Sequence, residues 1–207
     1  IRDYLTLKSK SGEIPTVNKI YDAFKLYTAR SQKPIEVIVQ DVYKYSRYYT
    51  NLLMQNGDDS DILEVLKDIS ILKVGVSYPF LMEVLNDYNE NMISKEELIT
   101  ILKMTESYVF RRALCGILTN SLNKTFATFT RSNIDKNNYL ESVTAKFLLL
   151  DSYRRFPDNR ELRESLLTKD VYNFRSRNYL LRKVENNKRK EKVIIDNYTI
   201  GHIMPQN

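Results

Sequence analysis

The chain has 207 residues, of which 43% are hydrophobic and 28% are charged, and its net charge is +6. This length and composition are typical of a globular protein with one large domain or two small ones. No apolar run approaches the roughly 20 residues of a membrane span, and no secretory signal pattern opens the chain, so no membrane association is expected. The single cysteine, Cys115, excludes an internal disulfide and predicts a buried thiol in a cytoplasmic protein.

Charge is unevenly distributed along the chain. Residues 56–106 contain 11 acidic and 4 basic side chains, whereas residues 150–207 contain 13 basic and 8 acidic ones. A polarised distribution of this kind can steer a nucleic-acid backbone towards one end of a molecule.

Helical periodicity dominates the first half of the chain. Residues 16–27 place Val17, Ile20, Phe24 and Tyr27 on one amphipathic stripe. A second, longer helix is predicted over residues 35–54, directly after a proline suited to a first helical turn. Two more helices are predicted over residues 61–74, with Asp61 as N-cap, and over residues 78–90.

The clearest helix start lies at Ser94, which forms a capping box with Glu97. The following residues, up to 122, are apolar on nearly all sides, which predicts the most buried helix of a bundle. Arg111 and Arg112 lie within this helix, and we expect them to pair with carboxylates elsewhere in the protein rather than to contact a ligand.

Three helices are predicted in the second half: residues 137–156, ending before Pro157; a short helix 159–167 capped by Asp158; and residues 169–189. Only after these does the pattern change, because residues 192–200 are β-branched and aromatic. The predicted fold is therefore all-α: a bundle of about eight or nine helices with a short β element at the C-terminus.

Few sequence motifs indicate a catalytic or ligand-binding site. The chain has no glycine-rich phosphate loop, no paired cysteines and no second histidine, so neither a nucleotide cradle nor a metal site is predicted from its residues. Tyrosines alternate with basic residues over residues 42–49, but Tyr45, Tyr48 and Tyr49 share a helical face. Packing at a helix seam is therefore favoured over base stacking.

Basic side chains are concentrated near the C-terminus. They form either a solvated charged face or a phosphate-contacting surface. The candidate DNA-binding residues are Arg175, Arg177, Arg182, Lys183, Lys188, Arg189 and Lys190.

The only histidine, His202, lies in the sequence YTIGHIMPQN. A strand that delivers a histidine into an I-x-P turn is the local geometry of the first element of an HNH, or ββα-metal, nuclease. In such sites the histidine is the general base that activates water beside a divalent cation.

The ordered motifs ESYVFRRALCG, FPDNRELRESLL, NYLLRKVEN and YTIGHIMPQN resemble those of GmrSD-type, modification-dependent restriction endonucleases. The N-terminal IRDYLTLKSKSGEIPTVNKIYDAFKLY resembles that family too, so the likeness covers essentially the whole chain. The resemblance assigns residues 1–190 to a helical connecting domain and residues 191–207 to the truncated start of the HNH nuclease domain.

The resemblance also implies partners and cofactors. A ParB-like N-terminal domain or subunit would bind and hydrolyse a nucleoside triphosphate, and the HNH domain would use Mg²⁺ or Mn²⁺ to cut modified phage DNA. No cofactor is expected in this fragment, and oligomerisation is left open.

His202 matches the catalytic base of the family. Gly201 departs from the family, which usually has glutamate there, so a carboxylate metal ligand is missing. No hydrolysis is therefore expected from this polypeptide alone. Two alternatives stay open: a protein-interaction scaffold with no nucleic-acid role, and a nuclease whose missing residues come from another chain.

Overall fold

The computed structural model describes residues 1–8, 14–55, 57, 59–131, 134–191 and 193. These residues form ten α-helices, four single-turn 3-10 helices and no strand. The α-helices are α1 (Arg2–Lys8), α2 (Ile20–Ser31), α3 (Ile35–Met54), α4 (Ser60–Ile71), α5 (Tyr78–Asn89), α6 (Lys95–Leu114), α7 (Leu122–Arg131), α8 (Tyr139–Leu148), α9 (Asn159–Thr168) and α10 (Arg177–Glu185). The predicted all-α bundle is confirmed. Of the predicted β element at 192–200, only Val193 is described.

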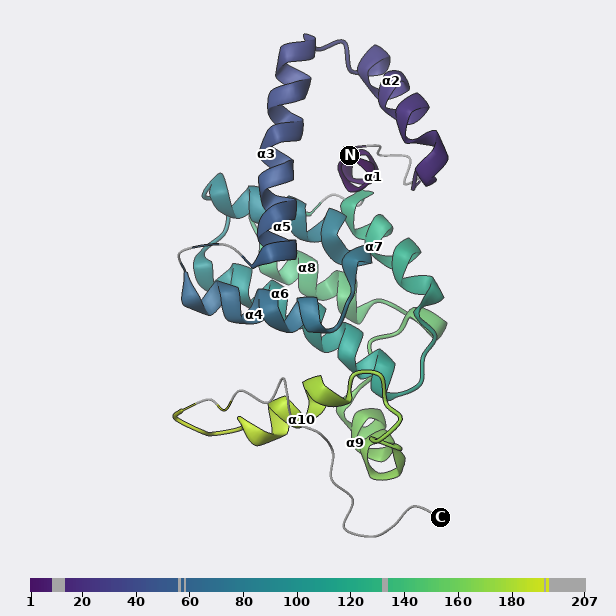
Figure 1. Cartoon of the computed structure of the whole chain (residues 1–207), viewed down its shortest axis with the longest axis vertical. Coiled ribbons are helices and arrows are strands. Elements are labelled where there is room, and N and C mark those ends of the chain that lie inside the picture. The colour runs from purple at the N-terminus through teal and green to yellow at the C-terminus, as the bar shows by residue number, and fades with distance from the viewer. Residues whose placement is uncertain (9–13, 56, 58, 132–133, 192, 194–207) are drawn as a thin grey trace.

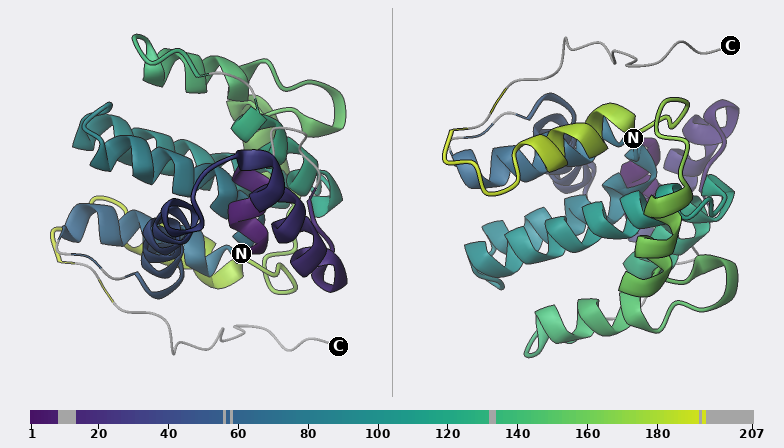
Figure 2. Two further views of the ribbon diagram at one scale, coloured as in Figure 1. Left: turned by 90° about the horizontal axis from the view of Figure 1, so that it is seen from above. Right: turned by 90° about the horizontal axis from the view of Figure 1, so that it is seen from below.

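The helices form a central body with an extension at each end (Figure 1). Helices α4 to α8 make up the body, α2 and the first half of α3 rise from one end, and α9 and α10 cover the other end. The end-on views in Figure 2 show α6 between α4 on one side and α8 on the other. None of the helices in the described part is both long and apolar enough to cross a membrane.

Helix α6 begins at the predicted capping box. The Glu97 N–H donates to Ser94 Oγ (3.2 Å), and the Ser94 N–H donates to the Glu97 carboxylate (2.8 Å). Leu98, Ile101 and Tyr108 have no exposed surface, which confirms α6 as a buried central helix.

The chain leaves α6 earlier than predicted. The helix ends at Leu114 instead of continuing to residue 122, because Gly116 adopts a left-handed conformation (φ +70°) that stops the helix. A separate helix, α7, then begins at Leu122, and the helical periodicity of the sequence had not distinguished it. Cys115, at the end of α6, is half-buried rather than fully buried.

Aromatic rings from four helices form the core of the body. The Phe80 ring lies 5.3 Å from the Phe129 ring, and the Phe147 ring lies 4.8 Å from Phe129 and 5.4 Å from Tyr108. Phe80, Phe147 and Tyr108 are fully buried. These edge-to-face contacts add to the area that the rings bury, so α5, α6, α7 and α8 are held as one unit.

Two further predicted helices are shorter than expected. The one predicted over 137–156 ends at Leu148, and a 3-10 turn, η4 (Ser152–Arg154), follows it. The one predicted over 169–189 is reduced to α10, because the Asp170 carboxylate accepts hydrogen bonds from Asn173 N (3.2 Å) and Asn173 Nδ2 (2.7 Å). Such side-chain bonds offer the backbone a turn in place of a helix.

The structure also tests two smaller sequence predictions, the N-cap of α4 and the packing of the tyrosines on α3. The N-cap of α4 is Asp59 rather than Asp61, because the Asp59 carboxylate accepts from the backbone at the start of the helix. Tyr45 and Tyr48 are buried against each other at 5.5 Å, which confirms packing at a helix seam.

Candidate nucleic-acid interface

Helix α10 carries most of the candidate DNA-binding residues and packs against α6 and α4. Its Tyr179 ring lies 4.7 Å from the Phe110 ring of α6. Leu180 is buried in a small cluster with Leu114 and Phe174. This apolar contact is limited, so polar contacts must contribute to holding the helix.

Two buried carboxylates supply those polar contacts. Asp68 of α4 and Glu106 of α6 are only 3% and 5% exposed. Both Arg182 and Lys183 donate to Asp68, the latter at 2.5 Å, and Lys183 Nζ also lies 2.7 Å from Glu106. The Tyr179 hydroxyl donates to Glu106. We call these five residues (Asp68, Glu106, Tyr179, Arg182 and Lys183) the α10 anchor.

The ionisation of the anchor follows from its burial. Burial raises the pKa of the Glu106 carboxyl, although Lys183 and Tyr179 donate to it. Burial also opposes the charge of Lys183, but its bonds to Asp68 and Glu106 outweigh that effect and raise its pKa. Removing one member of a buried pair leaves an uncompensated charge, which typically costs about 3–5 kcal/mol.

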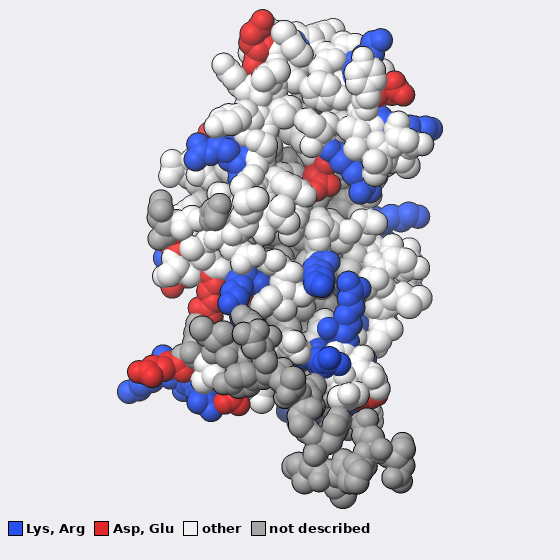
Figure 3. Space-filling view, in the orientation of Figure 1, with Lys and Arg blue, Asp and Glu red and all other residues white. Residues whose placement is uncertain are grey.

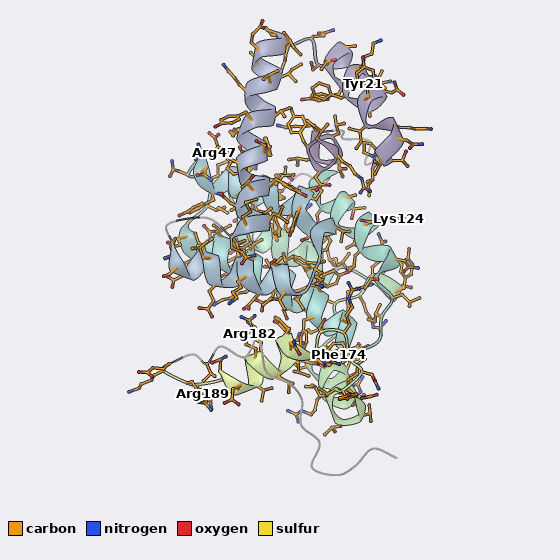
Figure 4. All side chains as sticks on the ribbon, in the orientation of Figure 1. Tyr21, Arg47, Lys124, Phe174, Arg182 and Arg189 are labelled. Atoms are coloured by element: carbon orange, nitrogen blue, oxygen red, sulfur yellow. The ribbon has the colours of Figure 1, made fainter. Side chains whose placement is uncertain are left out.

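The structure divides the seven predicted DNA-binding residues into two groups. In the first group, Arg182 and Lys183 pair with the buried acids, and the Arg182 side chain is 15% exposed whereas that of Lys183 is 43% exposed. Arg177 and Arg189 belong to the second group, although Arg189 pairs with Glu185 and Arg177 donates to the Tyr172 carbonyl (2.6 Å). In Figure 4, Arg182 lies against the body, whereas Arg189 lies at the far tip of this segment.

The second group faces solvent. Arg175, Lys188 and Lys190 are exposed and form no ion pair within the described residues. Arg177 and Arg189 are also exposed, and their hydrogen bonds are made at the surface. An interface with a polyanion would therefore use these five side chains rather than all seven.

The chain beyond α10 is tied back to the helix. Asn186 Nδ2 donates to the Val193 carbonyl (3.1 Å), and the Val193 N–H donates to Asn186 Oδ1 (2.7 Å). His202 and Gly201 lie outside the described residues. Within the described part of the chain, no three His, Cys, Asp or Glu side chains are grouped so that they could hold a metal ion.

The two acids of the α10 anchor, Asp68 and Glu106, were not predicted from the sequence. One signal was present, because Asp68 lies one turn after Val65 and next to Ile69, on the stripe that α4 buries. An acidic residue on a buried stripe needs a cation from elsewhere. The sequence did not show which cation that would be.

The expectation for Arg111 and Arg112 was wrong about their partners. Arg111 donates to Ser107 Oγ (3.1 Å) and to the Pro157 carbonyl (3.1 Å). Arg112 also donates to backbone carbonyls, and neither arginine contacts a carboxylate in the described structure. Apart from Ser107, which lies on α6, these acceptors belong to two segments outside the α-helices, and helical periodicity gives no information about such segments.

The surface in Figure 3 carries a group of Lys and Arg side chains in the lower half of the face that is shown.

Comparison with known proteins adds no assignment: no protein-family model matches the chain, and neither the curated proteins nor the solved structures gave a match.

Proposed function

We propose that this chain is the helical portion of a GmrSD-type, modification-dependent restriction endonuclease that acts on phage DNA in the cytoplasm. Its role is positional: it holds the segment that leads into the nuclease domain and offers basic surface to the DNA backbone. The divalent metal and the nucleoside triphosphate belong to the neighbouring domains. The ordered family-like motifs and the arrangement of α10 support this proposal.

The α10 anchor is the observation that carries the proposal. Two acids from α4 and α6 fix α10 from within the body, and Asn186 fixes the backbone at Val193. The chain therefore enters residues 194–207 from a defined place. The five exposed basic residues lie on or beside the same short segment, so a bound duplex would lie next to the start of the nuclease domain.

Charge reversal of the exposed group tests the DNA contact. The test variant combines Arg175→Glu, Lys188→Glu and Lys190→Glu, which leaves the α10 anchor intact. A matched control is needed, because any loss of positive charge weakens DNA binding. Lys25→Glu, Arg30→Glu and Lys33→Glu together make the same change in net charge at exposed positions on α2 and directly after it.

Binding is measured by fluorescence anisotropy with a labelled duplex over a series of salt concentrations. The slope of log Kd against log salt concentration reports the number of phosphate contacts. Each contact that is lost should therefore reduce this slope by about one. The test variant should bind more weakly and with a shallower slope, whereas the control should keep the slope of the unmodified chain. Equal behaviour of the two variants would contradict a DNA contact at α10.

One observation favours the scaffold alternative. On α3, Ile35, Val39 and Tyr43 follow one another at intervals of four residues and are 52%, 55% and 65% exposed. Residues spaced in this way share a helical face, so α3 presents apolar surface of the kind that binds proteins. Size-exclusion chromatography with duplex DNA, with and without candidate protein partners, separates the two functions. A scaffold would elute unchanged with DNA.

A further inference from the structure

A buried arginine far from α10 lacks an acidic partner. Arg112 is 1% exposed, and its guanidinium donates to the Tyr153 carbonyl (2.8 Å), the Leu118 carbonyl (2.9 Å) and Ser121 Oγ (2.7 Å). Its Nε is buried and has no hydrogen-bond partner within the described structure. A guanidinium does not lose its proton in a protein, so a positive charge without an opposing carboxylate remains at this position.

The three residues that accept these hydrogen bonds also line a surface cavity. The cavity has a volume of about 430 Å³ and is lined by Ile117, Leu118, Asn120, Ser121, Lys124 and Tyr153. We call it the Lys124 pocket. None of its lining residues is acidic, and the sequence has no Asp or Glu between residues 107 and 134. Lys124 is exposed and forms no ion pair within the described part of the chain.

An aromatic ring completes the pocket. Tyr153 is 60% exposed, and the Arg154 guanidinium lies 5.9 Å from the centroid of its ring. Arg154 Nε is buried and, like Arg112 Nε, has no hydrogen-bond partner among the described residues. The pocket thus combines a lysine, two arginines beside its wall, polar Asn and Ser side chains, and an accessible ring.

We propose that the Lys124 pocket binds a nucleotide unit. The phosphate is held by Lys124 in the positive field of Arg112, and the base stacks on Tyr153. Cations attract phosphate most strongly where acidic side chains do not oppose them. Every nucleobase has a face that can stack on an aromatic side chain. This pocket is separate from α10: in Figure 4, Lys124 lies on α7, well away from Arg182 and Arg189.

Two kinds of ligand contain such a nucleotide unit: a free mononucleotide and a nucleotide within a strand. Two binding assays on the full chain separate them. The first measures anisotropy of a short, labelled single-stranded oligonucleotide, and the second measures calorimetric binding of ADP. Lys124→Glu and Tyr153→Ala are the test variants, because both side chains are exposed and their loss leaves the buried core intact.

Matched controls make the same changes elsewhere. Lys103→Glu reverses an exposed lysine on α6, and Tyr21→Ala removes a ring that is 76% exposed on α2. Each test variant is expected to weaken binding by about tenfold, as the loss of one stacked base or one phosphate contact does, whereas the controls should stay close to the unmodified chain. Circular dichroism checks that all four variants are folded.

The outcomes distinguish this proposal from the one for α10. If the unmodified chain binds the oligonucleotide but not ADP, and the test variants weaken that binding, the ligand is a strand. If it binds ADP and the test variants weaken that binding, the ligand is a mononucleotide. If neither probe binds, or if both test variants bind like the unmodified chain, the pocket is not a nucleotide site. If the α10 variant alone loses oligonucleotide binding, the proposed function stands and the pocket proposal fails.

Discussion

Replacement of Glu83 by glutamine should change how the stability of this protein depends on pH. Glu83 lies on α5, one turn before Asp87, and its Oε2 is buried with no hydrogen-bond partner within the described residues. Asp87 already takes the nearby donors, Lys136 Nζ at 2.5 Å and the Tyr139 hydroxyl at 2.7 Å. Burial, and then the negative charge of Asp87, raise the pKa of Glu83 to about 7.

The sign of the effect follows from proton binding. The folded protein keeps the Glu83 proton up to about pH 7, whereas the unfolded chain releases it near the ordinary value of 4.5. The folded state therefore binds more protons between these values, and its stability falls as the pH rises through this window. Lys8, Lys136 and Lys146 lower the pKa of Glu83 but do not overcome burial and Asp87.

The size of the effect can be worked out from the same values. A pKa difference of one is worth about 1.4 kcal/mol, so the gap between 4.5 and about 7 sets an upper limit of about 3 kcal/mol. Glu83 is partly exposed and water screens its charge, so we expect about 1–3 kcal/mol. For a chain of this length, each kcal/mol changes the Tm by about 2–4 °C.

Urea denaturation followed by circular dichroism, from about pH 4.5 to about pH 8.5, measures this difference. Glu83→Gln should lose less stability than the unmodified chain as the pH rises, because glutamine has no proton to release in this window. Glu164→Gln, at an exposed position on α9, is the control and should follow the unmodified chain. Parallel curves for the unmodified chain and Glu83→Gln would refute burial of Glu83 as the cause.

Three further substitutions test the packing. Asp68→Ala leaves Arg182 without its buried partner and should cost about 3–5 kcal/mol in urea denaturation, with faster hydrogen exchange in α10; unchanged exchange in α10 would argue against the anchor. Arg112→Met removes three hydrogen bonds to irregular segments. It should lower stability by about 1–3 kcal/mol and expose residues 115–121 to proteolysis first, and uniform proteolysis would contradict that role. Ser94→Ala removes the N-cap of α6 and should cost about 0.5–2 kcal/mol in the same denaturation assay, whereas no loss would show that the capping box is dispensable.

Local signals were sufficient to predict much of the fold. The capping box at Ser94 identified the start of α6, and the spacing of Tyr45 and Tyr48 identified the face that α3 buries. These predictions succeeded because a cap or a stripe involves residues three or four apart in the sequence. The ends of helices were predicted less well, because Gly116 and Asp170 act through local conformations that compete with apolar periodicity.

For the candidate interface, too, local features were predicted from the sequence and contacts between distant residues were not. The sequence alone determined that basic residues gather near the C-terminus and that a helix lies among them. Only the tertiary structure decided that Arg182 and Lys183 pair with buried acids while Arg175, Lys188 and Lys190 form no ion pair within the described residues. Asp68, which lies 114 residues before Arg182, sets this difference. A buried charge takes its partner from whichever element the fold brings beside it, and no local pattern records that choice.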